Sequence, residues 1–307
     1  MTSTDLTLRA HGTTIAARHW AGAADRPLAG TAVVMAHGFG GTVDSGLADF
    51  AEPLARAGCD VVAFDYRGWG ASGDAPDAPR QQVSLQRQRD DYRAVLEHAR
   101  GLPGVTRVVL WGVSLSGGHV LSVAAGRDDV AAVVSLTPLV DGAAAGRLAL
   151  QHHTARHLAR STALGVRSRV AGRLGRTPSR MPIVARPGEL GALTLPGAYE
   201  DYTALAGPTW RNEVDAAVGL ELGAVKVGKD AADVRCPVLV QIADADRSAP
   251  PHAAATAAFA ARAQVRHYPC DHFDVWRIGA GTRPWHDAAV AHQIAFLERV
   301  LAPAPVA

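Results

Sequence analysis

Short, almost wholly apolar runs alternate along this chain with longer segments whose apolar residues recur every three or four positions. The first kind predicts buried strands and the second predicts helices that cover a sheet. Runs of the strand type occupy 32–36, 61–64, 108–111, 130–136, 237–242 and 265–268. Helical spacing occupies 47–57, 92–99, 120–124, 252–263 and 285–301, and weak alternation at 6–10 and 14–18 predicts an opening hairpin. The alternation indicates an α/β protein with a mostly parallel central sheet flanked by helices.

The pattern changes between residues 142 and 234, where no buried strand can be recognised. Residues spaced four apart predict a helix whose apolar stripe faces inward while its arginines face solvent. They are Leu158, Thr162, Val166, Val170 and Leu174. Prolines at 178, 182, 187, 196 and 208 divide the rest of the segment into short pieces. The segment is interpreted as a mainly helical cap insertion, which divides the chain into core residues 1–141, cap residues 142–234 and core residues 235–307.

Composition narrows the class of protein. The 307 residues are 48% hydrophobic and 20% charged, the proportions of a soluble globular protein. A formal net charge of +2 gives no general attraction to nucleic acid, and no apolar run is long enough for a membrane span. The N-terminus lacks the features of a secretory signal, and three scattered cysteines predict neither disulfides nor a metal site. These features favour a reducing, cytoplasmic setting.

A sharp turn is predicted at Ser114, between the apolar run 108–111 and the helical spacing that comes after it. Gly112 and Ser116, two positions before and after, are small, as a tight strand-to-helix turn requires. This is the nucleophile-elbow pattern, in which the central serine side chain is pushed outward. The helix that begins here points its positive dipole end toward the serine, a field that favours negative charge on a bound substrate oxygen. A glycine- and serine-rich turn without chemistry is the alternative.

A serine hydroxyl needs a base to react at neutral pH, and the base needs an orienting group. Asp244, Asp246 and His272 follow the last two predicted strands. Active sites in open parallel sheets lie beyond the carboxyl ends of the strands, so we expect these side chains near Ser114. Asp141, at the end of the preceding strand, is a further candidate acid. Structural roles are expected for the histidines without such placement, namely His11, His152, His153, His157 and His252.

Five motifs together resemble those of α/β-hydrolase-fold serine hydrolases. They are His37-Gly38-Phe39, Asp65-x-Arg67-Gly68-x-Gly70-x-Ser72-Gly73, the elbow at Ser114, Asp246-x-x-Ala249-Pro250 and Asp271-His272-Phe273. The resemblance implies that Ser114 is the nucleophile, His272 the general base and then acid, and Asp246 the orienting carboxylate. It also implies an oxyanion hole made by the backbone N–H groups of Phe39 and Leu115, and a reaction without metal or cofactor.

The resemblance implies cleavage of carboxylic esters with short to medium apolar acyl groups, through an acyl-enzyme intermediate. Thioesterases, amidases, peptidases and acyltransferases use the same triad, and a non-catalytic binding relative is a further alternative. The substrate is in each case a small ester or acyl compound. Apolar residues of the cap are candidates for an acyl pocket or for the core of the cap itself. They are 190–195, Tyr199, Tyr202, Leu205 and Trp210.

Three further patterns have two interpretations each. Residues 68–73 spell Gly-x-Gly-x-x-Gly, but Asp74, Pro76 and Pro79 exclude the helix that dinucleotide-binding folds place directly behind it, which favours a turn beside the site. Cys270 is either a small buried residue or a thiol whose oxidation lowers activity. The cap arginines form either a solvated helix face or an attraction for an acidic substrate or an anionic surface.

Overall fold

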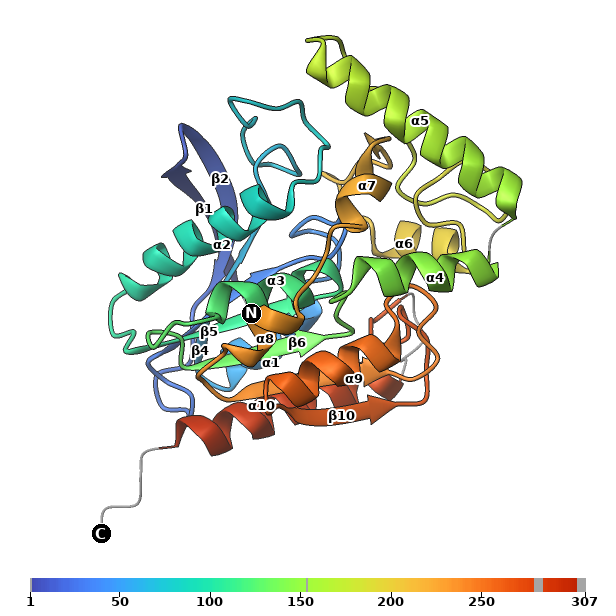
Figure 1. Ribbon diagram of the computed structural model, residues 1–307. Coiled ribbons are helices and arrows are strands. Elements are labelled where there is room, and N and C mark those ends of the chain that lie inside the picture. Colours follow the sequence, from blue (N-terminus) through green and yellow to red (C-terminus); the bar gives the residue numbers. More distant parts are fainter. Residues whose placement is uncertain (1, 153, 279–283, 303–307) are drawn as a thin grey trace.

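An eight-stranded sheet forms the centre of the computed structural model, which describes residues 2–152, 154–278 and 284–302 (Figure 1). The strands lie in the order β1-β2-β4-β3-β5-β6-β9-β10. β2 pairs antiparallel with β1 and with β4, and all other neighbours are parallel, so the mostly parallel sheet is confirmed. The strands are β1 Ser3–Ala10, β2 Thr13–Trp20, β3 Thr31–Ala36, β4 Cys59–Phe64, β5 Arg107–Val113, β6 Ala132–Leu136, β9 Val238–Ala243 and β10 Gln264–Tyr268.

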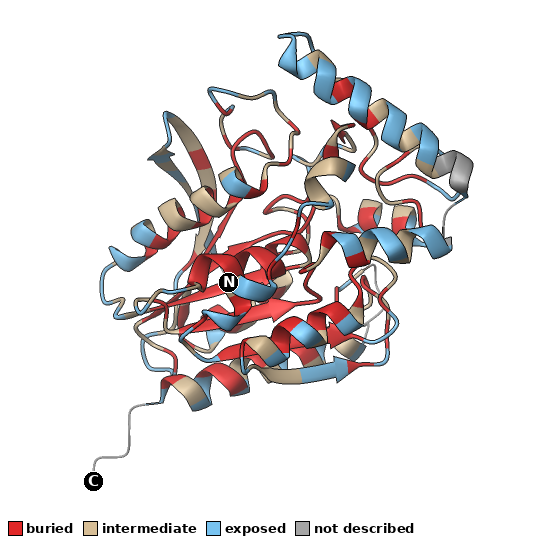
Figure 2. Ribbon diagram, in the orientation of Figure 1, coloured by how far each residue is buried: buried red, intermediate tan, exposed pale blue. Residues whose placement is uncertain are grey.

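Helices cover both faces of the sheet. On one face α1 contacts α10, and on the other α2, α3, α8 and α9 form a row in which each helix contacts the next (Figure 1). Every residue of β3 and of β9 is buried, because helices exclude water from both sides (Figure 2). These helices are α1 Ala48–Arg56, α2 Leu85–Arg100, α3 Leu115–Ala124, α8 Gly228–Ala232, α9 Pro251–Ala260 and α10 Pro284–Leu301.

Most element boundaries lie within a few residues of the prediction, but α2 begins at Leu85, well before the predicted apolar spacing at 92–99. Ser84 caps its first turn, since its hydroxyl accepts a hydrogen bond from the Arg87 N–H at 3.4 Å. The inward positions of the next turns are Gln88 and Asp91, both buried. Hydrophobic periodicity does not detect a helix whose buried face is polar there. The predicted tail 303–307 lies outside the described residues.

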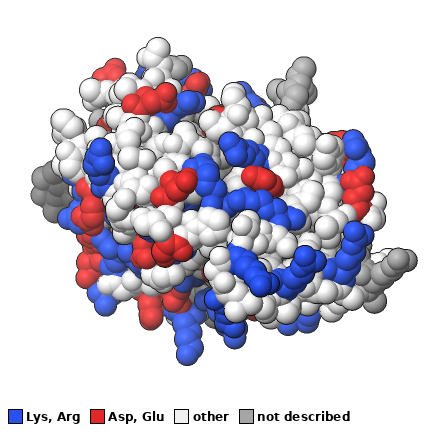
Figure 3. Space-filling view, turned by 90° about the horizontal axis from the view of Figure 1, so that it is seen from above, with Lys and Arg blue, Asp and Glu red and all other residues white. Residues whose placement is uncertain are grey.

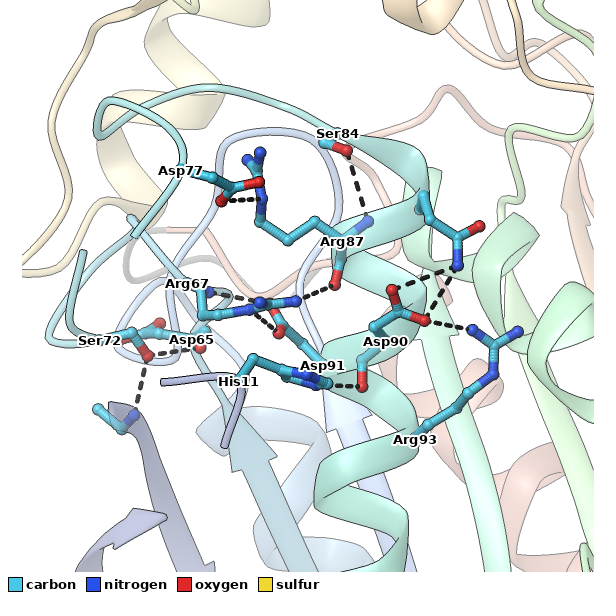
Figure 4. A network of polar contacts seen from close by, with 12 residues as sticks. His11, Asp65, Arg67, Ser72, Asp77, Ser84, Arg87, Asp90, Asp91 and Arg93 are labelled. Carbon is cyan, nitrogen blue, oxygen red and sulfur yellow. Dashed lines mark hydrogen bonds and ion pairs between the residues drawn. The ribbon is translucent and has the colours of Figure 1, made fainter. Parts of the chain in front are cut away.

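The glycine run 68–73 is a turn that a polar network anchors beside α2 (Figure 4). Buried Arg67 forms an ion pair with buried Asp91, and its guanidinium also donates to the carbonyl of Arg87 at 3.2 Å. The carboxylate of Asp65 accepts the N–H groups of Val43 at 2.7 Å and Ala71 at 2.9 Å. Burial raises the pKa of Asp65 to about 6, although these two N–H bonds lower it. The network fixes the loop that follows β4.

The segment between β6 and β9 is mainly helical, and it lies above one edge of the core (Figure 1). It contacts the loop that follows β3 through the Tyr202 hydroxyl, which donates a hydrogen bond to the carbonyl of Phe39 at 2.6 Å. Among the described residues no helix combines the length and the apolarity needed to span a membrane. Besides α8, its elements are α4 Gly142–His152, α5 Ala155–Arg173, β7 Arg180–Met181, α6 Ala198–Leu205, β8 Val214–Asp215 and α7 Val218–Leu222.

The predicted orientation of α5 is wrong over its second half. Val166, Val170 and Leu174, the last one residue beyond the helix, are 49%, 50% and 64% exposed instead of facing inward. Gly165 and Ser168 face the body: a side chain on Gly165 would lie 2.9 Å from the carbonyl of Ala216, and the Ser168 hydroxyl donates to Asp215 at 2.7 Å. The helix therefore docks through Gly165 and Ser168 with partly buried Leu164, and its apolar spacing marks the outer face only from Val166 onward. Leu158 and Thr162, earlier in that spacing, line a cavity.

Candidate active site

Ser114 lies in a strained turn between β5 and α3, with φ 57° and ψ −119°. A positive φ is costly for a residue with a side chain, and two bonds from the end of β6 and the loop after it hold it here. The Ser114 N–H donates to the Leu136 carbonyl, and the Ser114 carbonyl accepts the Leu139 N–H, both at 2.9 Å. A Cβ on Gly112 would lie 2.2 Å from the Ser116 carbonyl oxygen. The small residue predicted there is thus required by the close approach of the backbone.

The loops after β9 and β10 bring His272 and Asp246 together. The Nδ1 of His272 lies 2.6 Å from the Oδ2 of Asp246, and both side chains are buried. The other carboxylate oxygen of Asp246 accepts the N–H groups of Ser248 and Ala249, each at 2.7 Å. Asp246 is therefore held rigidly, with one oxygen left for the imidazole.

The two alternative acids lie elsewhere. Asp244 is about half exposed and contacts the ring of His267 on β10 at 2.7 Å. Asp141 accepts the Ala144 N–H at 2.8 Å in the first turn of α4. Of the three candidate acids, only Asp246 is bonded to His272.

The electrostatic surroundings of His272 favour its protonated form. Burial is the largest single effect and lowers the pKa of the imidazole. The charge and hydrogen bond of Asp246, together with the charge of Asp271, outweigh burial, so the pKa is raised above its ordinary value of 6.5. A base whose pKa is raised in this way holds an abstracted proton more firmly than a free imidazole does.

Ser114 and His272 line one small cavity of about 20 Å³, together with Leu193 and Tyr202 from the segment between β6 and β9. In the described structure no hydrogen bond joins the Ser114 hydroxyl to His272. Such bonds are often long in the absence of substrate and shorten when it binds. The cavity has room for about one water molecule. An acyl group larger than a water molecule must therefore extend into space beyond this cavity.

Two backbone donors are free beside Ser114. Among the described residues, neither the N–H of Phe39 nor that of Leu115 donates a hydrogen bond. Gly38 places the first of them close to the serine, since a Cβ on Gly38 would lie 2.7 Å from the Cβ of Ser114. Free N–H groups on both sides of a nucleophile are what a developing oxyanion needs.

Two aromatic side chains of the insertion hold the loop that carries Phe39. The hydroxyl of Tyr202 donates to the Phe39 carbonyl at 2.6 Å, and the indole N–H of Trp210 donates to the Gly40 carbonyl at 3.1 Å. Burial raises the pKa of Tyr202 well above its ordinary value, so the hydroxyl keeps its proton. Sequence reasoning placed both residues in an acyl pocket or a cap core and missed these bonds.

His37 and Cys270 are buried beside the site in uncharged forms. The His37 ring stacks on Trp276 at 4.9 Å and donates to the Ser45 carbonyl at 2.9 Å; burial lowers its pKa to about 4. Burial, followed by the charge of Asp274, raises the pKa of Cys270 to about 12. A thiol that stays protonated reacts slowly with oxidants, which favours the interpretation of Cys270 as a buried filler.

The histidines for which structural roles are expected are described only in part. His11 contacts the carbonyl of Asp90 at 3.2 Å, and His252 lies in α9. The cluster His152, His153 and His157 lies outside the residues whose side chains are described. No group of three or more His, Cys, Asp or Glu side chains within the described ranges is arranged to hold a metal ion.

A mostly parallel sheet with a serine elbow after β5 and an Asp–His pair after β9 and β10 defines the α/β-hydrolase superfamily. Residues 29–273 match the family model described as serine aminopeptidase, S33, and the chain belongs to this family.

Known proteins of several activities are similar to the chain. It is 32% identical over 274 residues to the quorum-quenching protein AidA of Acinetobacter baumannii, covering 88% of this chain and 86% of that protein. It is 30% identical over 161 residues to the thiohydrolase aneE of Aspergillus aculeatus, covering 52% and 49% respectively. The crystal structure of the α/β hydrolase GrgF from Penicillium superposes with a TM-score of 0.78 at 20% identity, covering 99% of this chain and 100% of that one.

Proposed function

We propose that the protein hydrolyses carboxylic esters with short to medium apolar acyl groups through an acyl-enzyme intermediate. The observation that carries the proposal is the shared cavity of Ser114 and His272, with His272 bonded at 2.6 Å to a buried carboxylate. Membership of a serine hydrolase family supports it. The proposed reaction needs only groups that the chain itself supplies.

In the proposed mechanism, the free Nε2 of His272 takes the proton of the Ser114 hydroxyl while Oγ attacks the ester carbonyl carbon. The resulting oxyanion accepts hydrogen bonds from the backbone N–H groups of Phe39 and Leu115. The C–O bond then breaks, and the imidazolium returns its proton to the departing alcohol. A water molecule, deprotonated by the same imidazole, attacks the acyl-enzyme and releases the acid and the free serine.

Asp246 has an orienting role in this scheme. By accepting from Nδ1 it keeps the proton on that nitrogen and leaves Nε2 free to act as the base. Its negative charge also stabilises the imidazolium that forms after proton abstraction.

The insertion 142–234 is proposed to act as a cap that binds the acyl group. An apolar cavity of about 320 Å³ lies between α4 and α5, and its wall includes Gly191 and Ala192. The next residue, Leu193, lines the cavity of Ser114. The segment 191–193 thus contributes to the walls of both cavities, and the larger one suits a medium-length chain. We assign the acyl chain to this cavity.

Filling the acyl cavity should alter chain-length preference and leave the chemistry intact. Ala192→Phe is expected to lower kcat/KM for p-nitrophenyl octanoate about tenfold or more, since the added ring occupies the space of the chain, and to leave p-nitrophenyl acetate nearly unchanged. Ala159→Phe, on the exposed side of α5, is the matched control. An equal loss on both esters would contradict the assignment.

Loss of the Tyr202 hydroxyl should weaken the transition state more than substrate binding. Tyr202→Phe is expected to lower kcat about tenfold with little change in KM, because the Phe39 N–H is then less firmly positioned for the oxyanion. Tyr199→Phe, a half-buried neighbour whose hydroxyl does not bond to this loop, is the control. A parallel rise in KM, or an equal loss in the control, would show that Tyr202 acts in binding or packing alone.

A fluorophosphonate probe tests the proposed function directly. It should label the wild-type protein and fail to label Ser114→Ala, since the probe reacts only with an activated serine. Graded p-nitrophenyl esters then measure the preferred chain, and matched thioesters and aminoacyl substrates compete in the same assay. Thioesters form a specific second candidate, because a relative is named a thiohydrolase. Absence of labelling in both proteins would favour a binding protein.

A further inference from the structure

Large apolar side chains are exposed mainly on one part of the molecule. Among the described residues, four of the five exposed large hydrophobic side chains belong to α4 or to α5 and its end. They are Leu150, Val166, Val170 and Leu174, and the fifth is Phe259 on α9. Leu150 and Leu174 are each 64% exposed. The apolar exposure is therefore concentrated on the outermost part of the segment between β6 and β9.

On α5 these side chains form a continuous strip. Val166, Val170 and Leu174 are spaced four apart, so they follow one line along the helix, opposite the small residues that dock it to the body. Ala159 and Ala163, also exposed, extend the same line toward the start of the helix. In Figure 1 α5 lies farther from the sheet than the other helices, and Figure 2 shows most of its described length exposed.

Arginines border the strip on both sides. At 3.6 residues per turn, Arg160 and Arg167 fall along one border and Arg169 and Arg173 along the other. All four are exposed, and none forms an ion pair with another described residue. Residues 142–188 contain nine arginines and no aspartate or glutamate. Figure 3, viewed from above, shows basic side chains and broad uncharged surface on this face, with some acidic side chains among them.

We propose that α5 binds an anionic lipid surface, with its apolar strip at the boundary between headgroups and acyl chains and its arginines on the lipid phosphates. An apolar strip bordered by basic residues is the arrangement of helices that lie in a membrane interface. Long arginine side chains reach outward from such a position to the headgroups. The face thus combines both attractions that such binding needs.

The charges and shape of α5 argue against other occupants. A second copy of this chain would bring the same arginines against one another. The two hollows beside α5 are lined by residues outside the strip, with Arg169 and Arg173 in one of them. A rigid partner would therefore find no pocket on the strip itself, whereas a fluid surface adapts to a protruding helix. This inference concerns α5 alone and does not depend on the proposed hydrolysis.

Co-sedimentation with vesicles tests the inference. Wild-type protein is expected to bind equimolar phosphatidylcholine–phosphatidylglycerol vesicles, to bind phosphatidylcholine vesicles much less, and to be released by high salt. The combined change Val166→Ser, Val170→Ser and Leu174→Ser should lower the partition coefficient about tenfold or more. Arg169→Gln and Arg173→Gln should each lower it about fivefold. Phe259→Ser, the matched exposed change on α9, should bind like the wild type.

Two outcomes would overturn the proposal. One is a wild-type protein that does not sediment with the anionic vesicles. The other is an apolar triple variant that binds the anionic vesicles as tightly as the wild type does. If both proteins also bind soluble polyglutamate equally well, the arginines would be assigned to an acidic protein partner. Thermal unfolding followed by circular dichroism checks that each variant is folded.

Discussion

Replacing His272 by alanine is expected to lower kcat/KM for the best ester about 10⁴-fold or more, because Ser114 then loses the imidazole that a buried carboxylate orients. Labelling by the fluorophosphonate probe should fall in parallel. His267→Ala is the matched control, since His267 also contacts an aspartate but does so on the exposed side of β10. Activity of His272→Ala close to that of wild type would show that His272 is not the general base.

The same imidazole should set the acid limb of the pH profile. Only neutral His272 accepts the Ser114 proton, so kcat/KM should fall as the pH drops through its pKa. Asp246 and Asp271 raise that pKa above 6.5 against the effect of burial, so the limb should have its midpoint above 6.5. A midpoint well below 6.5 would mean that another group limits the reaction.

Asp246→Asn is expected to lower kcat about 10⁴-fold with little change in fold. The amide that this substitution introduces can donate to Nδ1 of His272, which favours the tautomer that protonates Nε2 and so removes the base. The imidazolium also loses its counter-charge.

Asp244→Asn supplies the control for this substitution. It changes the same chemical group two residues away, but on a side chain that contacts His267 instead of His272. Steady-state kinetics with p-nitrophenyl esters should show a large loss for the first variant and nearly wild-type rates for the second. The reverse order would assign the orienting role to Asp244.

The sheet and the serine turn could be predicted because both leave local signals. The runs at 32–36, 61–64 and 237–242 are apolar throughout or nearly so, since strands covered on both faces cannot carry exposed side chains. Gly112 is small because the turn at Ser114 brings the Ser116 carbonyl oxygen within 2.2 Å of the place that its Cβ would occupy. Both signals arise from sterics that act within a few residues.

Other features depend on contacts between distant parts of the chain. The outward apolar strip of α5 was misplaced because Gly165 and Ser168, two weakly marked residues, decide which face docks. The choice of Asp246 over Asp244 depended on a resemblance, and the two are distinguished in space by the loop geometry around His272. The bond from Tyr202 to the Phe39 carbonyl spans 163 residues and leaves no local pattern.

In the proposed mechanism, that long-range bond would couple substrate fit to reactivity. Tyr202 on α6 and Trp210, just before β8, hold the carbonyls of the loop that carries the Phe39 N–H. A compound too bulky for α6 to keep its position would draw the Tyr202 hydroxyl away from the Phe39 carbonyl and loosen the loop. Such a compound would be bound without being cleaved, so it would act as a competitive inhibitor instead of a substrate.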